Sequence, residues 1–212
     1  MGKALSKKIF IIASIILAGF LFAIWLARST LGSFLHPNDD LFAECRSTQI
    51  VGGAGTIGGA FSLINQDGET VSDKDVITEP SLVYFGYTFC PDVCPMDILK
   101  ISNFIGKYPN IKKEIDFIFI TVDPERDKPQ VLREFLSNFN QEIIGLSGSN
   151  EKVSATLSKF RIYAKKNNTD SPKDDMYLVD HSSLIFFMDE NDSYITHFNS
   201  KYFENQFTKY VN

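Results

Sequence analysis

One segment constrains the fold more than any other, because in it an apolar run breaks at a turn and continues as a helix. The run at 82–87 predicts a buried strand, and the pattern at 95–108 predicts a helix with its apolar positions on one side. Cys90 and Cys94 stand at the start of that helix. Helix positions i and i+4 lie one turn apart on the same face, so both sulfurs can point at one small target. We expect that target to be a disulfide bond or a soft metal ion.

From Pro80 onward, apolar runs alternate with helical patterns. This alternation predicts a central α/β sheet covered on both faces, with the two thiols at the carboxyl end of a strand, where such sheets place their sites. Ahead of this region, residues 65–68 read as the turn of a hairpin. The remaining expected strands are 115–122, 143–146, 176–179, 183–188 and 194–198, and the remaining expected helices are 129–139, 151–163 and 202–210.

The N-terminal part predicts a membrane anchor. Residues 9–27 are 19 consecutive residues without a charge, about the ~20 that cross a hydrocarbon core as a helix. Three lysines lie within residues 1–8 and only Arg28 follows closely, so the positive-inside bias keeps 1–8 in the cytoplasm and sends the rest across. A cleavable signal peptide is the alternative, but its apolar region would be shorter, roughly 7 to 15 residues, and this run ends in a poor cleavage site.

Composition separates the anchor from the rest of the chain. Residues 28–59 predict a tether, because they are glycine-rich and show no sustained periodicity. Residues 60–212 are expected to form one folded domain. Beyond Arg28, 17 of the 21 basic residues remain against 26 acidic ones, which leaves a formal charge near −9. This charge argues against nucleic acid as a partner and fits a domain on the outer side of a membrane.

Three segments of the chain carry a family resemblance: YFGYTFCPDVCP, FITVDPERDKP and YLVDHSSLIFFMD. In this order and spacing they resemble the SCO/SenC family of membrane-anchored copper proteins, which help to assemble cytochrome c oxidase. The likeness covers about residue 59 to the C-terminus. It implies a thioredoxin-like central sheet flanked by helices, so that 60–212 would be a copper-binding domain behind an N-terminal transmembrane helix.

The resemblance also implies which residues form the site. By it, the copper ligands would be Cys90, Cys94 and His181. Asp123 would lie near the site as a supporting residue, and Asp127 is expected to help hold the same loop. The implied partner is cytochrome c oxidase subunit II or another copper-site protein.

The donor chemistry supports copper independently of the resemblance. Two thiolates and one imidazole make a three-coordinate soft site that suits Cu(I), and an added ligand lets it hold Cu(II). A structural zinc site would normally use a fourth protein ligand. Cys90 is favoured as a thiolate by the helix dipole, and Pro91 fits the first helical position.

Plainer interpretations exist for each of these residues. The cysteine pair could be a structural disulfide, although a bond that closes so short a loop adds little stability. His181 could be a core histidine, but its place in Asp-His-Ser-Ser, opening a strand at the sheet edge, favours a ligand. Asp123 could simply cap a turn. His36 and His197 are expected to be ordinary surface residues. Cys45, in the tether, stays open as an unpaired thiol, a cross-link to a second chain or an accessory ligand.

The competing function is a membrane-tethered thiol-disulfide oxidoreductase that reduces cysteines of the oxidase subunit or of other targets. Cys90 would attack and Cys94 would resolve the mixed disulfide, and the same fold hosts such enzymes. Against it, three residues separate the cysteines instead of the two of the thioredoxin motif. In addition, Asp180-His181-Ser182 stands where such an enzyme would carry its cis-proline. A copper or redox sensor would need the same ligands as a chaperone.

We therefore expect a single-pass, membrane-anchored copper chaperone whose folded domain faces the periplasm from the bacterial inner membrane. The short N-terminus has no long presequence rich in arginine and serine, which favours this setting over the mitochondrial inner membrane.

Overall fold

The structure is a computed structural model, and it describes Gly19 and residues 57–108, 115–167 and 177–211. The chain divides into two compact units, 1–51 and 52–212. Every helix and strand treated below belongs to the second unit. Among the described residues, no helix has the length and apolar character that a membrane span requires. The expected anchor at 9–27 lies outside the described residues except for Gly19, and so do Cys45 and most of the tether.

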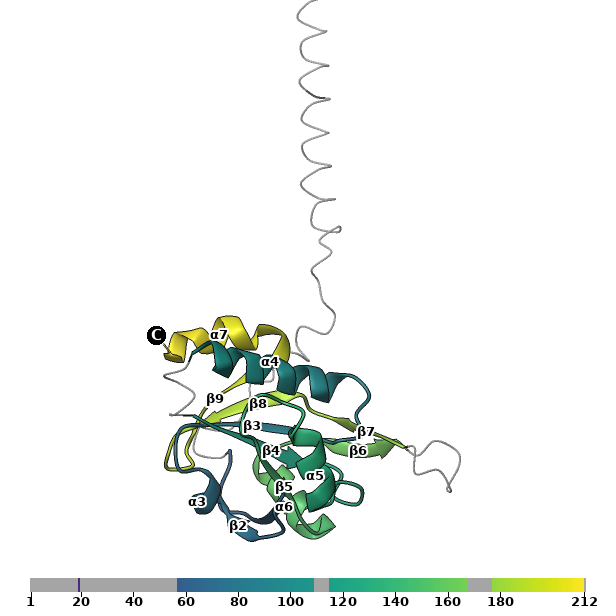
Figure 1. Cartoon of the computed structure of the whole chain (residues 1–212). Coiled ribbons are helices and arrows are strands. Elements are labelled where there is room, and N and C mark those ends of the chain that lie inside the picture. Colours follow the sequence, from purple (N-terminus) through teal and green to yellow (C-terminus); the bar gives the residue numbers. More distant parts are fainter. Residues whose placement is uncertain (1–18, 20–56, 109–114, 168–176, 212) are drawn as a thin grey trace, which may run out of the picture. The chain divides into compact units, whose positions relative to one another are not determined.

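A seven-stranded mixed sheet with the strand order β2-β1-β5-β4-β3-β8-β9 forms the centre of this unit (Figure 1). Strands β3, β4 and β5 run parallel and the other pairs are antiparallel. All of β3 is buried, as expected for a parallel strand with both faces covered. The strands are β1 (Ser62–Asn65), β2 (Thr70–Ser72), β3 (Ser81–Gly86), β4 (Asp116–Thr121), β5 (Ile144–Ser147), β8 (Leu184–Met188) and β9 (Tyr194–Asn199).

Helices cover both faces of the sheet, as the alternating pattern predicts. Side chains of neighbouring strand residues point to opposite faces. Tyr84 therefore contacts Phe119 of β4, which contacts Phe135 of α5 at 6.0 Å between ring centroids, while Phe85 contacts Phe160, just after α6, at 5.1 Å on the other face. The helices are α3 (Asp73–Val76), α4 (Val93–Lys107), α5 (Pro129–Leu136), α6 (Asn150–Lys159) and α7 (Phe203–Val211), with a 3-10 turn, η3, at Ser200–Tyr202.

A cluster of phenylalanines joins α4 and α7 to the sheet. We call the five side chains named here the aromatic cluster. Phe207 of α7 lies at its centre, with ring centroids 5.1 Å from Phe187 of β8 and 5.5 Å from Phe198 of β9. Phe104 of α4 and Phe203 of α7 complete it, 5.7 Å and 5.2 Å from Phe207. All five are buried, so this part of the core is almost wholly apolar.

Two strands form a separate antiparallel ribbon: β6 (Ala164–Asn167) and β7 (Leu178–His181). We expected a helix over 151–163, but α6 ends at Lys159 and the chain turns through Arg161, whose φ of 56° lies in the left-handed region. The sequence of β6, Ala-Lys-Lys-Asn, has no alternating apolar pattern and predicts no strand. Pairing with β7, which sets Ala164 opposite His181, makes it one.

The first described residues of the second unit, from Ile57, already belong to the packed domain. Ile57 is buried, and the Gly58 N–H donates to the Lys159 carbonyl at 3.1 Å. Packing therefore starts a few residues ahead of 60, where the tether was expected to end. The predicted hairpin is present as β1 and β2, with Gly68 in its turn at a φ of 86° that favours glycine.

Candidate functional site

The two cysteines lie at the junction of β3 and α4. The structure corrects the prediction that Cys90 and Pro91 begin the helix, because α4 begins at Val93 and only Cys94 lies in its first turn. Asp92, at the N-cap, has non-helical backbone angles and makes no side-chain cap. Instead, the Cys94 N–H donates to the Cys90 sulfur at 3.4 Å. Cys90 thus satisfies one of the N–H groups that every helix start leaves unpaired.

The two thiols, both reduced, differ in their readiness to ionise. The hydrogen bond from the Cys94 thiol, helped by backbone N–H groups, lowers the pKa of Cys90 to about 5. The same bond together with burial raises the pKa of Cys94. At neutral pH the pair is therefore a partly exposed thiolate on Cys90 and a buried thiol on Cys94. A thiolate is the nucleophilic and metal-binding form of cysteine, so Cys90 meets an incoming partner first.

His181 reaches the thiols from the β6–β7 ribbon. Its Nε2 lies 3.5 Å from the Cys94 sulfur, and its Nδ1 lies 3.1 Å from the Val179 carbonyl oxygen. A carbonyl can only accept, so Nδ1 carries a hydrogen, and in the neutral imidazole the Nε2 lone pair then faces the sulfur. The Tyr87 ring stands edge-on to the imidazole at 5.6 Å. His181 is the last residue of β7, which corrects the expectation that it opens a strand at the edge of the main sheet.

The distance between Cys94 and His181 suits one small, soft ion. A sulfur and an imidazole nitrogen that share one ion, at bond lengths of ~2.3 Å and ~2.0 Å, stand roughly 3.5 to 3.8 Å apart. The observed separation between Cys94 Sγ and His181 Nε2 is 3.5 Å. No three histidine, cysteine or acidic side chains in the described part of the chain are already spaced to hold a metal ion. Metal binding therefore requires the donors, among them the partly exposed Cys90, to close in.

Behind Cys94, the sheet leaves just enough space for its sulfur. A Cβ added to Gly86 would lie 3.0 Å from Cys94 Sγ and within 3.1 Å of the Tyr84 and Phe119 rings. Tyr84 donates from its hydroxyl to the Asp97 carboxylate at 3.1 Å. Burial, with Cys94 and Asp97 close by, raises the pKa of Tyr84, so it stays a neutral donor. No local pattern in the sequence marks Gly86, Tyr84 or Asp97, because their role depends on the packing of α4 on β3.

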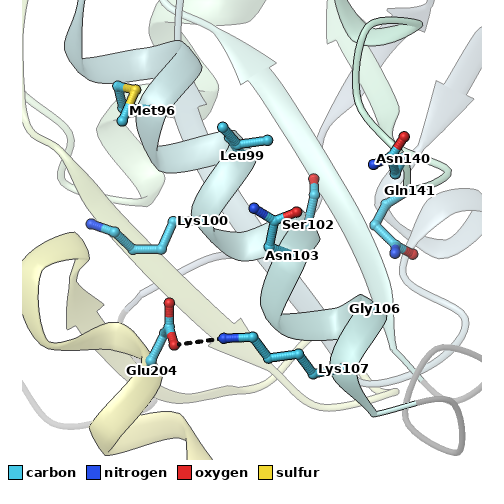
Figure 2. Close-up of a pocket in the computed structure, with 10 residues that line it drawn as sticks. All are labelled: Met96, Leu99, Lys100, Ser102, Asn103, Gly106, Lys107, Asn140, Gln141 and Glu204. Atoms are coloured by element: carbon cyan, nitrogen blue, oxygen red, sulfur yellow. Dashed lines mark hydrogen bonds and ion pairs between the residues drawn. The ribbon is translucent and has the colours of Figure 1, made fainter.

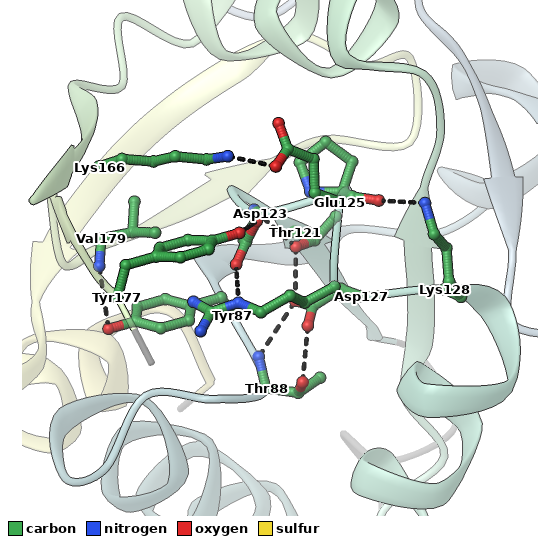
Figure 3. A network of polar contacts seen from close by, with 12 residues as sticks. Tyr87, Thr88, Thr121, Asp123, Glu125, Asp127, Lys128, Lys166, Tyr177 and Val179 are labelled. Carbon is green, nitrogen blue, oxygen red and sulfur yellow. Dashed lines mark hydrogen bonds and ion pairs between the residues drawn. The ribbon is translucent and has the colours of Figure 1, made fainter. Parts of the chain in front are cut away.

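Asp127 ties the cysteine loop to the loop after β4. Its carboxylate accepts from the Thr88 N–H at 3.0 Å, the Thr88 hydroxyl at 2.6 Å and the Thr121 hydroxyl at 2.6 Å (Figure 3). Asp127 is fully buried, and burial raises its pKa. We expected Asp127 to help hold the VDPERD loop, and its bond to Thr121, at the end of β4 where that loop begins, does so. Its bonds to Thr88 also hold the loop that leads into Cys90.

Asp123 contacts Tyr177, the residue immediately ahead of β7, and Arg126 of its own loop. Its carboxylate accepts from the Tyr177 hydroxyl at 2.7 Å (Figure 3). It also pairs with Arg126 Nε at 2.5 Å. Burial and the Asp123 carboxylate raise the pKa of Tyr177, which therefore remains a donor. Neither Arg126 nor Tyr177 was expected at the site from the sequence. The position of Arg126 inside the DPERD segment was the available signal, whereas Tyr177 stands 54 residues from Asp123 with no local pattern to mark it.

A surface groove of about 610 Å³ lies beside α4, between Met96 and Lys107 (Figure 2). Its lining has polar and apolar side chains but neither cysteine nor histidine, so we do not assign it to the candidate site.

His197, expected at the surface, is half-buried against Tyr194, whose hydroxyl lies 2.5 Å from His197 Nδ1. Burial lowers the pKa of His197. His36 lies outside the described residues.

The chain is similar to proteins of one family. A family model described as SCO1/SenC matches residues 51–212. An SCO2-like protein of Rickettsia prowazekii is 40% identical over 142 residues, covering 67% of this chain and 69% of that protein. Protein SenC of Rhodobacter capsulatus is 43% identical over 157 residues, covering 73% and 69%.

Solved structures agree with this likeness. The structure of Bradyrhizobium japonicum ScoI with copper bound is 38% identical and has a TM-score of 0.66, covering 73% of this chain and 97% of that one. The similarity confirms the predicted thioredoxin-like α/β fold.

Proposed function

This chain belongs to the SCO1/SenC family, and from that premise we propose that it binds copper through Cys90, Cys94 and His181. It delivers this copper during the assembly of cytochrome c oxidase, to the copper site of subunit II. The observation that carries the proposal is the 3.5 Å approach of Cys94 Sγ to His181 Nε2, between residues 87 positions apart, beside the Cys90 thiolate. The copper-bound ScoI of Bradyrhizobium japonicum supports the choice of metal.

In this proposal each donor has a separate task. The Cys90 thiolate, partly exposed, takes the copper first. The buried Cys94 thiol then loses its proton and adds the second sulfur, and the lone pair of His181 Nε2 supplies the third donor. A thiolate-rich acceptor removes the copper by ligand exchange, because a three-coordinate site leaves a position open for an incoming sulfur. Asp123 supports the site by accepting from Tyr177, the residue ahead of the strand β7 that carries His181.

The proposed location rests on the sequence alone. The apolar run at 9–27, with lysines ahead of it, supports a single-pass anchor in the bacterial inner membrane and a domain in the periplasm. A mitochondrial inner membrane is the alternative. Fractionation of the source cells, with protease added to intact and to opened spheroplasts, tests this: cleavage of the domain in intact spheroplasts supports a periplasmic domain, and protection until lysis contradicts it.

The metal site is tested by titrating the reduced full-length chain with Cu(I) against a calibrated competing chelator. We expect one tightly bound copper, loss of stable binding in Cys90→Ala, and weaker binding in His181→Ala. His197→Gln is the matched control, because it removes an imidazole outside this site. Copper binding by His181→Ala that is as tight as in the wild type would contradict the three-ligand proposal.

A second candidate function is thiol-disulfide exchange, and the lowered pKa of Cys90, about 5, favours it. The Cys90 thiolate attacks a target disulfide, forms a mixed disulfide and releases one target thiolate. Cys94, once deprotonated, attacks the Cys90 sulfur, which frees the second target thiolate and leaves a Cys90–Cys94 disulfide. A thiol reductant must then restore the pair. Cys94→Ala should trap the mixed disulfide. If Cys90→Ala and His181→Ala both left copper binding unchanged, thiol-disulfide exchange would be favoured over copper delivery.

A further inference from the structure

Arg126 lies at the centre of a group of acidic and aromatic side chains beside the thiols. Its Nε pairs with the Asp123 carboxylate at 2.5 Å, and its side chain is only 12% exposed. Its Cζ atom lies 3.6 Å from the centroid of the Tyr177 ring and 4.7 Å from that of Phe89. Phe89 is the neighbour of Cys90 in sequence, so the guanidinium touches both the cysteine loop and the residue that precedes β7. A planar guanidinium can stack on rings and bind a carboxylate at the same time.

Tyr177 is held from two sides. Its hydroxyl donates to the second oxygen of Asp123 at 2.7 Å, and Lys166 Nζ lies 4.6 Å from its ring centroid (Figure 3). Tyr177 stands immediately ahead of β7, so these contacts fix the start of the strand whose last residue is His181. We call Asp123, Arg126 and Tyr177 the clasp.

The rest of β7 is tied to the cysteine loop by Tyr87. The Val179 N–H donates to the Tyr87 hydroxyl at 3.2 Å, and the Tyr87 ring packs edge-on against His181 at 5.6 Å. The cysteine loop is in turn held by Asp127 through Thr88. Residues 123–127 therefore anchor both segments that bring donors to the site, one through Asp127 and the other through the clasp.

We propose that Arg126 and Tyr177 are positioning residues that hold β7 against the 123–127 loop and thereby set the distance between His181 and Cys94. This inference deepens the proposed function and rests on it. In this proposal neither residue is a copper ligand, and both act through His181. A ligand must be held within roughly 0.5 Å of its productive position by the residues around it, and a strand of four residues outside the main sheet needs such support.

The first test compares two tyrosines that flank the same ribbon. Tyr177→Leu removes both the ring over Arg126 and the hydroxyl bond to Asp123. Tyr163→Leu is the matched control, since Tyr163 precedes β6 and its side chain is exposed. With Cu(I) titrated into the full-length reduced chain against a competing chelator, we expect Tyr177→Leu to weaken binding about tenfold, the usual order for a residue that orients a metal ligand. Tyr163→Leu should stay at the wild-type value, and Tyr177→Phe, which keeps the ring, should restore most of the affinity.

A double substitution shows whether the clasp acts through the histidine. If it does, adding Tyr177→Leu to His181→Ala should not lower the Cu(I) affinity any further, because the group that Tyr177 positions is already gone. A further tenfold loss in the double variant would overturn the proposal, since it would mean that Tyr177 acts elsewhere. Denaturant unfolding of each variant confirms that the affinities belong to folded protein.

A metal-free measurement separates this proposal from the proposed function. The Val179 N–H donates to the Tyr87 hydroxyl, so its hydrogen exchange reports whether β7 is held against the cysteine loop. Followed by NMR, this exchange should be faster in Tyr177→Leu than in the wild type or in Tyr163→Leu, because the strand is released. Unchanged exchange in Tyr177→Leu would overturn the clasp whatever the metal does. Conversely, unchanged copper affinity in His181→Ala would defeat the three-ligand proposal while leaving the exchange result to judge the clasp.

Discussion

The two ends of α4 lie in opposite kinds of surroundings. Toward its C-terminus, Phe104 packs among the rings of the aromatic cluster. At its N-terminus, Cys94 lies where hydrogen bonds join three segments that are distant in sequence. Apolar burial has no direction and acts on the stability of the fold, whereas hydrogen bonds have narrow geometry and fix distances between atoms. The helix thus connects a region that stabilises the domain with a region that positions donors.

The largest expected effect belongs to the aromatic cluster. Phe207 is fully buried and contacts four other phenylalanines, so Phe207→Ala should lower the free energy of unfolding by about 3 to 5 kcal/mol through lost contacts and a cavity. Urea unfolding measures this, with the half-exposed Tyr202→Ala as control. The Cu(I) affinity of the folded variant should not change. A loss of Cu(I) affinity in the folded Phe207→Ala variant would contradict the claim that one end of α4 stabilises the domain while the other positions the donors.

The next effect concerns ionisation at the site. With a pKa of about 5 for Cys90, nearly all of this thiol is ionised at pH 7, roughly 30- to 100-fold more than for a thiol of ordinary pKa near 8.5 to 9. The rate of Cys90 alkylation by iodoacetamide should therefore rise as the pH passes through about 5 and stay level above pH 6. In Cys94→Ala the midpoint should move to higher pH, because the hydrogen bond that lowers the pKa is lost. A midpoint near pH 8.5 in the wild type would refute the claim that Cys90 is ionised at neutral pH.

A smaller effect, on both stability and affinity, is expected where the sheet meets the thiols. Gly86→Ala places a methyl group 3.0 Å from the Cys94 sulfur, which should lower stability by about 1 to 3 kcal/mol through overpacking. Because the sulfur has to move, Cu(I) affinity should fall about tenfold. Gly106→Ala, near the other end of α4, meets only the side-chain end of Gln141 and should stabilise the helix. Equal changes in stability and in Cu(I) affinity in the two variants would show that the two ends of α4 do not differ in function.

The smallest effect belongs to the surface. Lys107 and Glu204 form an ion pair at 3.2 Å with both side chains well exposed (Figure 2). Exposed pairs contribute little, so Lys107→Gln should change the free energy of unfolding by less than about 0.5 kcal/mol and leave copper binding unaltered. Urea unfolding at low and high salt checks this. A loss above about 1 kcal/mol would show that the pair, rather than the phenylalanines, joins α7 to α4.

Local patterns in the sequence were sufficient for most of the fold. The buried runs that became β3 and β4, and the helical periods of α4 and α7, are properties of short stretches of chain, and their predicted limits lie within a few residues of the observed ones. The nearness of Cys90 to Cys94 follows from their spacing alone. The family resemblance supplied His181 and Asp123, which no local pattern would have joined to the thiols.

Tertiary structure decided the features that depend on residues far apart in the chain. Strand β6 exists because β7 pairs with it, and Cys90 lies outside α4 because its sulfur, rather than a helical turn, takes the Cys94 N–H. Tyr177 meets Asp123 across 54 residues, and His181 meets Cys94 across 87. Periodicity and spacing describe neighbours along the chain, whereas a site assembled from segments far apart in sequence is defined by distances that exist only after the sheet has formed.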